Sequence, residues 1–242
     1  MNVEITLQNY EEQVERFCSP LPLPLHNSHM TLGLVEEITT ELVKAFSPEK
    51  GMDLKNAVEE LGDIAWFASQ YCRKNGIVFA DLLKNSYDMF VANKIVFDEL
   101  EGTNELLLVS VTKKEIAYGK IPTKEQREEA ILNICHQIVL YSFHIMRSQI
   151  IKTKQEACFA TLTEEMKQED AMTALQEASQ LSEDETSNTI STVLSWIVST
   201  VLATNWHKLS ARYGDKFSED RANNRDLAAE DAVLAESIET AK

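Results

Sequence analysis

The chain has 242 residues, of which 44% are hydrophobic, and it holds only 7 glycines and 5 prolines, which fits one large or two small helix-rich folded domains. The net charge is −16, with 39 acidic against 23 basic residues. Nucleic acid and anionic membranes both need a basic surface, so this charge argues against either as a general partner. A small anionic substrate stays compatible, because a bound divalent cation reverses the local field.

Cysteines and leader signals indicate the compartment. Cys18, Cys72, Cys135 and Cys158 form no CxxC pair, and a reduced environment suits them. The first residues lack the basic and apolar segments of a secretory signal. The longest apolar stretch, 189–203, is too short and too rich in Ser and Thr to cross a bilayer. We therefore expect a soluble, cytoplasmic protein.

In chain order, apolar spacing predicts helices over residues 1–18 (short, or an arm), 29–46, 53–74, 79–100, 124–152 and 187–213. Three prolines predict an extended segment at residues 20–24. Turn residues separate helices at 47–51 and 101–104. Residues 105–123 stay ambiguous between a helix and a helix with a short extended piece, and residues 153–187 predict a loosely packed helix and loop.

No convincing strand alternation occurs, so the predicted class is all-α, a bundle of four or more core helices. A single domain is expected over residues 1–218. Its core helices span about 29–100 and 188–214, with an extra helical insert at about 104–187. The insert could be a degenerate copy of the first helical pair. Residues 219–242 predict a polar tail that is helical or partly disordered.

Acidic residues occupy the apolar side of two consecutive predicted helices. Glu60 and Asp63 lie about 60° apart on a helix, on the same side as Ile64. Glu37 and Glu41 lie about 40° apart on the preceding helix. Burying unpaired carboxylates is costly, so this placement indicates a cation partner. Four carboxylates with oxygen ligands favour Mg²⁺ or Mn²⁺ over zinc.

Basic and amide side chains end the apolar stripe of the last long helix. The stripe continues onto Asn205, Lys208 and Arg212, and a Lys and an Arg on one face suit phosphate oxygens. Salt bridges at the bundle end, or side chains reaching past the core edge, are the alternatives. Lys44 shares the face of Glu37 and is a further candidate for substrate binding. The chain has no Glu-x-x-His, which counts against a ferritin-like di-iron bundle.

Two segments of the sequence resemble a known family. The runs Leu32-Gly33-Leu34-Val35-Glu36-Glu37-Ile38 and Glu60-Leu61-Gly62-Asp63-Ile64-Ala65-Trp66 resemble the MazG-like branch of the all-α nucleotide pyrophosphohydrolases. The run from Asn205 to Ser218 is similar to the closing helix and loop of that family. Two features depart from the family pattern. Thr40 stands where an acid is usual, so either Glu41 one step later substitutes in a shifted register or Glu36 takes part; the insert is also atypical.

The resemblance implies a bundle of the all-α NTP pyrophosphatase type that cleaves a nucleoside triphosphate to a monophosphate and pyrophosphate. Glu37, Glu41, Glu60 and Asp63 would hold Mg²⁺, Lys208 and Arg212 would neutralise the pyrophosphate, and Asn205 would orient sugar or base. A homodimer or higher homo-oligomer is also implied. The alternatives are a catalytically decayed helical protein that binds nucleotides or serves in assembly, and an acidic protein that binds partners through residues 104–188.

Overall fold

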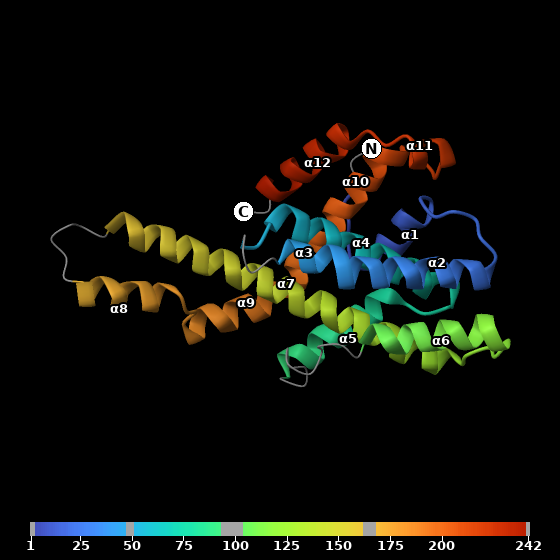
Figure 1. The fold of residues 1–242 in the computed structure, drawn as a ribbon, viewed down its shortest axis with the longest axis horizontal. Coiled ribbons are helices and arrows are strands. Elements are labelled where there is room, and N and C mark those ends of the chain that lie inside the picture. The colour runs from blue at the N-terminus through green and yellow to red at the C-terminus, as the bar shows by residue number, and fades with distance from the viewer. Residues whose placement is uncertain (1–2, 47–50, 93–103, 162–167, 241–242) are drawn as a thin grey trace.

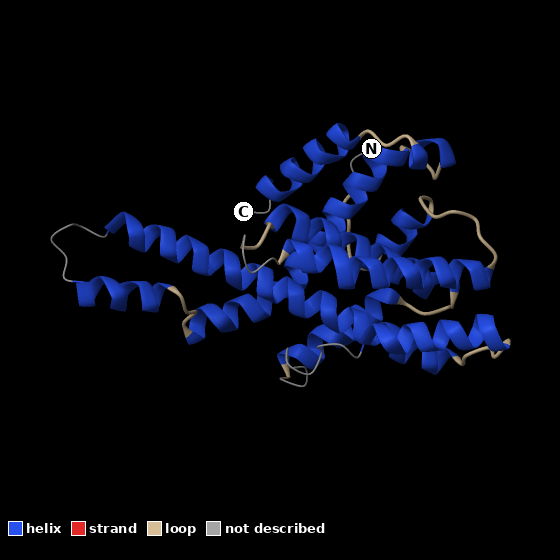
Figure 2. Ribbon diagram, in the orientation of Figure 1, coloured by secondary structure: helices blue, strands red, loops and turns tan. Residues whose placement is uncertain are grey.

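The computed structural model describes residues 3–46, 51–92, 104–161 and 168–240, and over these residues the protein is helical with no strand (Figures 1 and 2). The helices are α1 (Tyr10–Glu15), α2 (Leu23–Glu36), α3 (Leu42–Ala45), α4 (Leu54–Lys74), α5 (Phe79–Val91), α6 (Asn104–Tyr118), α7 (Lys124–Thr161), α8 (Gln168–Ala178), α9 (Glu183–Trp196), α10 (Ala203–Tyr213), α11 (Glu219–Asn223) and α12 (Leu227–Thr240). Two π-helical turns interrupt this series, η1 (Glu37–Glu41) and η3 (Ile197–Leu202). The all-α class is confirmed.

Several boundaries differ from the sequence expectation. Helix α2 begins at Leu23, earlier than predicted, because the first turn of a helix needs no backbone donor and therefore accepts Pro24. The ambiguous stretch after residue 104 is the regular helix α6, and α7 continues to Thr161 instead of ending near residue 152. Residues 93–100 of the predicted helix 79–100, residues 101–103 of the predicted turn and most of the break at 47–51 lie outside the described residues, while Asn104 begins α6.

Helix α4 forms the centre of the bundle and packs against α1, α2, α5, α7 and α10. The Asp53 side chain caps its start by accepting a hydrogen bond from the backbone N–H of Asn56 at 3.2 Å. Apolar side chains cover most of its surface, and Leu61 and Ala65 are fully buried. A long helix surrounded by neighbours fixes the direction of every side chain on it, and this is the helix that carries Glu60 and Asp63.

Helix α7 belongs to the same core in its first half and leaves it in the second. Ile131, Ile134 and Ile138 are fully buried against the bundle. Beyond the bundle, the end of α7 runs alongside α8 as an arm that extends to one side of the molecule (Figure 1). A hydrogen bond of 3.0 Å from Gln155 Nε2 to Ser179 Oγ joins the two sides at the base of this arm.

The predicted tail at residues 219–242 contains two helices in its described part. Helix α12 packs along α10 and also contacts α4, and Figure 1 shows it at the edge of the molecule beside α10. Among its described side chains, Glu230 and Leu234 are buried. Across the described residues, no helix combines the length and apolar content needed to cross a membrane.

Candidate functional site

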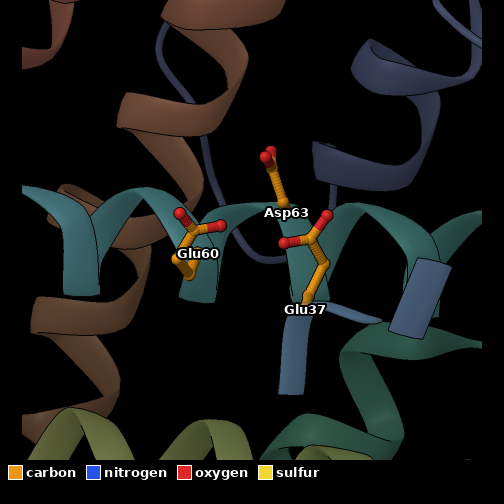
Figure 3. Close-up of side chains that lie close together, drawn as sticks. All are labelled: Glu37, Glu60 and Asp63. Carbon is orange, nitrogen blue, oxygen red and sulfur yellow. The ribbon is translucent and has the colours of Figure 1, made fainter. Parts of the chain in front are cut away.

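Three carboxylates from two packed helices converge beside the closing helix. Glu60 and Asp63 lie one turn apart on α4, and Glu37 begins the π turn η1 after α2. One oxygen from each of the three side chains lies within 4.8 Å of the others, and Figure 3 shows the three side chains close together. Glu60 is buried, while Glu37 and Asp63 are half-buried. We call Glu37, Glu60 and Asp63 the carboxylate triad.

The triad carries unfavourable electrostatics in the absence of a cation. Burial, the negative charge of Asp63 and a hydrogen bond to Glu60 raise the pKa of Glu37 to about 9. Burial and the charge of Asp63 likewise raise the pKa of Glu60 to about 7, although the hydrogen bond from Glu37 opposes that rise. Buried acids with these neighbours must take up protons or gain a cation. A divalent ion would relieve the repulsion.

The donor chemistry of the triad fits a hard divalent cation. It offers carboxylate oxygens from two helices and contains no His or Cys ligand. Mg²⁺ and Mn²⁺ prefer oxygen ligands and commonly keep several waters, so three protein carboxylates are sufficient. Zinc sites by contrast are dominated by nitrogen and sulfur ligands. The residues present therefore fit Mg²⁺ or Mn²⁺.

Lys208 lies behind the triad as its internal counter-charge. Its Nζ donates hydrogen bonds to both carboxylate oxygens of Asp63 at 2.6 Å and to Glu59 Oε1 at 3.3 Å. The side chain is fully buried. Burial alone would lower the pKa of Lys208, but the charges of Asp63 and Glu59 raise it above its usual value. Lys208 therefore stays charged inside the protein and places a cation next to the triad.

Asn205 joins Asp63 to the N-terminal helix. Its Nδ2 donates to Asp63 Oδ1 at 2.9 Å, and its Oδ1 accepts a hydrogen bond of 2.8 Å from the hydroxyl of Tyr10 in α1. Tyr10 is fully buried. Tyr10 is not among the residues predicted from the sequence, because nothing in its local pattern distinguishes it from a core tyrosine. The contact that reveals its role joins residues 195 positions apart.

Gly62 allows the closing helix to approach α4. A Cβ atom at this position would lie 2.9 Å from Asn205 Cβ and 3.4 Å from the carbonyl oxygen of Val201. A side chain would therefore push the two helices apart or displace Asn205. The Leu-Gly step between Glu60 and Asp63 thus has a packing reason: it brings Asn205 and Lys208 within hydrogen-bonding distance of Asp63.

Not all predicted site residues meet in the triad. Glu41 lies outside it and accepts a hydrogen bond of 2.7 Å from Lys44, an ion pair in which the Lys44 side chain is 62% exposed. The π turn explains the separation of Glu41 from Glu37. In η1 the backbone N–H of Leu42 bonds to the carbonyl of Glu37, five residues back, so the angles differ from those of an α-helix.

Arg212 lies near the triad but is engaged elsewhere. It is one turn beyond Lys208 on α10, and the charge of Asp63 contributes to raising its pKa. Its Nε and Nη2 donate to the two carboxylate oxygens of Glu230 at 3.0 and 2.6 Å. Of the predicted residues, the structure therefore brings Glu37, Glu60, Asp63, Asn205 and Lys208 together, with Arg212 adjacent.

Both helices that complete the site with α4 contain a π turn. Turn η1 includes Glu37, and η3 immediately precedes the helix that carries Asn205 and Lys208. A π turn accommodates an extra residue at the cost of regular hydrogen bonding, and such turns are frequent at functional sites. Both helical segments that meet α4 at the triad therefore depart from regular α-helical geometry close to the candidate site.

A separate groove of about 640 Å³ lies where the start of α4 meets α7 and the end of α9. Its lining includes Leu54, Met146 and Trp196, and none of the triad residues. Its charged lining residues are Lys152, Lys154 and Glu156, which do not form a cluster of carboxylates. The triad is therefore the better candidate for a functional site, because it clusters carboxyl groups whose pKa values are raised.

No family model, curated protein or solved structure matches this chain.

Proposed function

We propose that this protein is a Mg²⁺-dependent nucleoside triphosphate pyrophosphohydrolase, with Mn²⁺ as a possible substitute ion. The observation that carries the proposal is that Glu37, Glu60 and Asp63 from two helices place one oxygen each within 4.8 Å of the others, with Lys208 and Asn205 hydrogen-bonded to Asp63. The fold would then be of the all-α NTP pyrophosphatase type that the sequence resembles. A cytoplasmic homo-oligomer belongs to the same proposal.

The proposed reaction hydrolyses the bridge between the α- and β-phosphates. Water adds its oxygen to one phosphorus, the bridging oxygen leaves with the other, and the products are a nucleoside monophosphate and pyrophosphate. Glu37, Glu60 and Asp63 would hold Mg²⁺, which supplies charge neutralisation and a lowered pKa of bound water. A carboxylate of the site that is not bound to the ion would accept the proton of the attacking water.

The basic residues act on the phosphate chain. Lys208 is fully buried and shares Asp63 with Asn205, so it places a fixed positive charge beside a proposed metal ligand. Such a preorganised cation stabilises developing negative charge without reorganising at the moment of reaction. Asn205 is fixed by Tyr10 on one side and Asp63 on the other. It would orient the sugar or base at the edge of the site.

The competing interpretation is that the chain is a catalytically decayed protein that binds nucleotides or serves in assembly. One observation favours it: Glu41 pairs with the exposed Lys44 and contributes no oxygen to the triad. A site with fewer acidic ligands can bind an ion less tightly and still bind nucleotide. Hydrolysis separates the two functions.

The test is pyrophosphate release from a panel of NTPs and dNTPs with Mg²⁺ or Mn²⁺, using the full chain. We expect monophosphate and pyrophosphate in equal amounts. Glu37→Gln should lower the rate at least about a hundredfold, because metal ions supply several kcal/mol of transition-state stabilisation. Glu36→Gln is the matched control, since Glu36 is the exposed neighbour on the same helix and lies outside the triad.

A second readout does not depend on turnover. Mg²⁺ should raise the unfolding temperature of the wild-type chain and of Glu36→Gln, and should raise that of Glu37→Gln much less, because an ion that binds only the folded state stabilises it. Circular dichroism checks that each variant remains helical. Nucleotide binding without release of pyrophosphate from any substrate of the panel would favour the decayed protein and remove the enzymatic proposal.

A further inference from the structure

Glu230 of α12 is held by two arginines at once. Its carboxylate oxygens lie 3.0 and 2.6 Å from Nε and Nη2 of Arg212, and 3.3 and 2.6 Å from Nε and Nη2 of Arg225. The Glu230 side chain is only 4% exposed. Two guanidinium groups that each present a fork to a single anion form an arrangement suited to a phosphate group, which has more oxygens to accept these bonds than a carboxylate has.

This pair of arginines lies next to the carboxylate triad. Arg212 follows Lys208 by one turn on α10, so the cations continue along one helix face. The two side chains are close enough that the positive charge of Arg212 opposes the rise in the pKa of Lys208, while the charge of Asp63 reaches Arg212. Arg212 therefore lies one helical turn beyond the residue whose Nζ bonds to Asp63 of the triad.

Helix α12 is attached to the molecule through few buried side chains. Of those described in α12, only Glu230 and Leu234 are buried, and most of the others are exposed. One further contact to α4 is the exposed ion pair between Asp231 and Lys55. Glu230 is the buried charged residue among the described side chains of α12, so its ion pairs with Arg212 and Arg225 are part of the docking of this helix. A stronger anion at the arginines could therefore displace the helix.

We propose that Arg212 and Arg225 form the binding site for the diphosphate end of the nucleotide, and that Glu230 occupies this site as an internal competitor until the substrate replaces it. The identity of the ligand rests on the proposed function; the anion site itself rests on the two arginines and their shared carboxylate. Binding then exchanges the carboxylate of Glu230 for phosphate oxygens and loosens α12. Arg225 becomes a substrate-binding residue that lies outside the closing helix.

The experiment measures binding of inorganic pyrophosphate to the full chain by calorimetry, with a chelator present and no nucleotide. Glu230→Gln should bind pyrophosphate about tenfold more tightly than the wild type, because the competing charge is gone. Asp231→Asn removes the same unit charge from the neighbouring residue and should change the affinity by less than about twofold, as is usual for an exposed pair. Adding Arg225→Ala to Glu230→Gln should cancel the gain.

Hydrogen exchange of the wild-type chain supplies a readout that needs no variant. Saturating pyrophosphate should speed exchange of the α12 amides while leaving those of α4 unchanged. Equal affinity in the wild type and Glu230→Gln, or unchanged exchange in α12, would overturn the inference. Tighter binding by Glu230→Gln without any hydrolysis keeps the anion site and removes the proposed function. Hydrolysis together with equal pyrophosphate affinity in the wild type and Glu230→Gln keeps the proposed function and removes the anion site.

Discussion

Gly62 shows how a single missing side chain positions the site. Alanine at this position would place a Cβ 2.9 Å from that of Asn205. We expect Gly62→Ala to lower the free energy of unfolding by about 1–3 kcal/mol, the usual cost of overpacking a core. Turnover should also fall, because Asn205 and Lys208 move relative to Asp63. Urea unfolding and the pyrophosphate assay check the two effects, and wild-type values in both would contradict this account of Gly62.

At the residue scale, the sequence could predict the acids but not all their partners. Glu60 and Asp63 were identifiable because they share a helix face with apolar residues, and the structure does bring both into the triad. Glu41 shares the predicted face of Glu37, yet a π turn directs it to Lys44. Tyr10 could not be found, since its contact with Asn205 depends on how distant helices pack. The spacing of residues in the sequence identifies which of them share a helix face, whereas the tertiary fold decides which helix faces pack together.

At the scale of elements, the docking of α12 should depend on pH. Burial alone would raise the pKa of Glu230, but the hydrogen bonds and charges of Arg212 and Arg225 lower it from 4.5 to about 2. A carboxyl with a lowered pKa in the folded state contributes stability that is complete above about pH 4.5 and is lost as the pH falls towards 2. The sequence could not predict this contact, because the acid and both arginines are ordinary charged residues in a polar tail.

The corresponding measurement compares the unfolding free energies of the wild type and Glu230→Gln across pH. Their difference should stay constant between pH 5 and 7 and shrink between pH 4.5 and 2, where Glu230 takes up a proton. Asp231→Asn again serves as the control, since its ion pair with Lys55 is exposed. A difference that grows as the pH falls would contradict the assigned role of Glu230.

At the scale of the whole molecule, the arm formed by the end of α7 and α8 is separate from the site. Residues 157–178 can be replaced by a short Gly/Ser linker, because Gln155 and Ser179 are hydrogen-bonded at the base of the arm. We expect the unfolding temperature to change by only about 2–4 °C, as for a loss of about 1 kcal/mol in a chain of this size. The rate of hydrolysis should be retained.

Light scattering on the same protein tests what the arm does. An unchanged oligomeric state with full activity would show that the arm serves neither assembly nor catalysis. Loss of the oligomer would assign the arm to assembly, and loss of hydrolysis would contradict its separation from the site. The all-α class was predictable from hydrophobic periodicity, and the polar composition of residues 153–187 indicated loose packing there. The continuation of α7 without a break from the core to Thr161 was not predicted.

The π turn η1 has a consequence in genetic terms. A helix that gains one codon must either rotate everything after it or widen a single turn to absorb the extra residue, and widening leaves the packing on both sides in register. Thr40 is exposed within η1, between Glu37 and Glu41. Loss of its codon would leave two acids three positions apart on an unbroken helix.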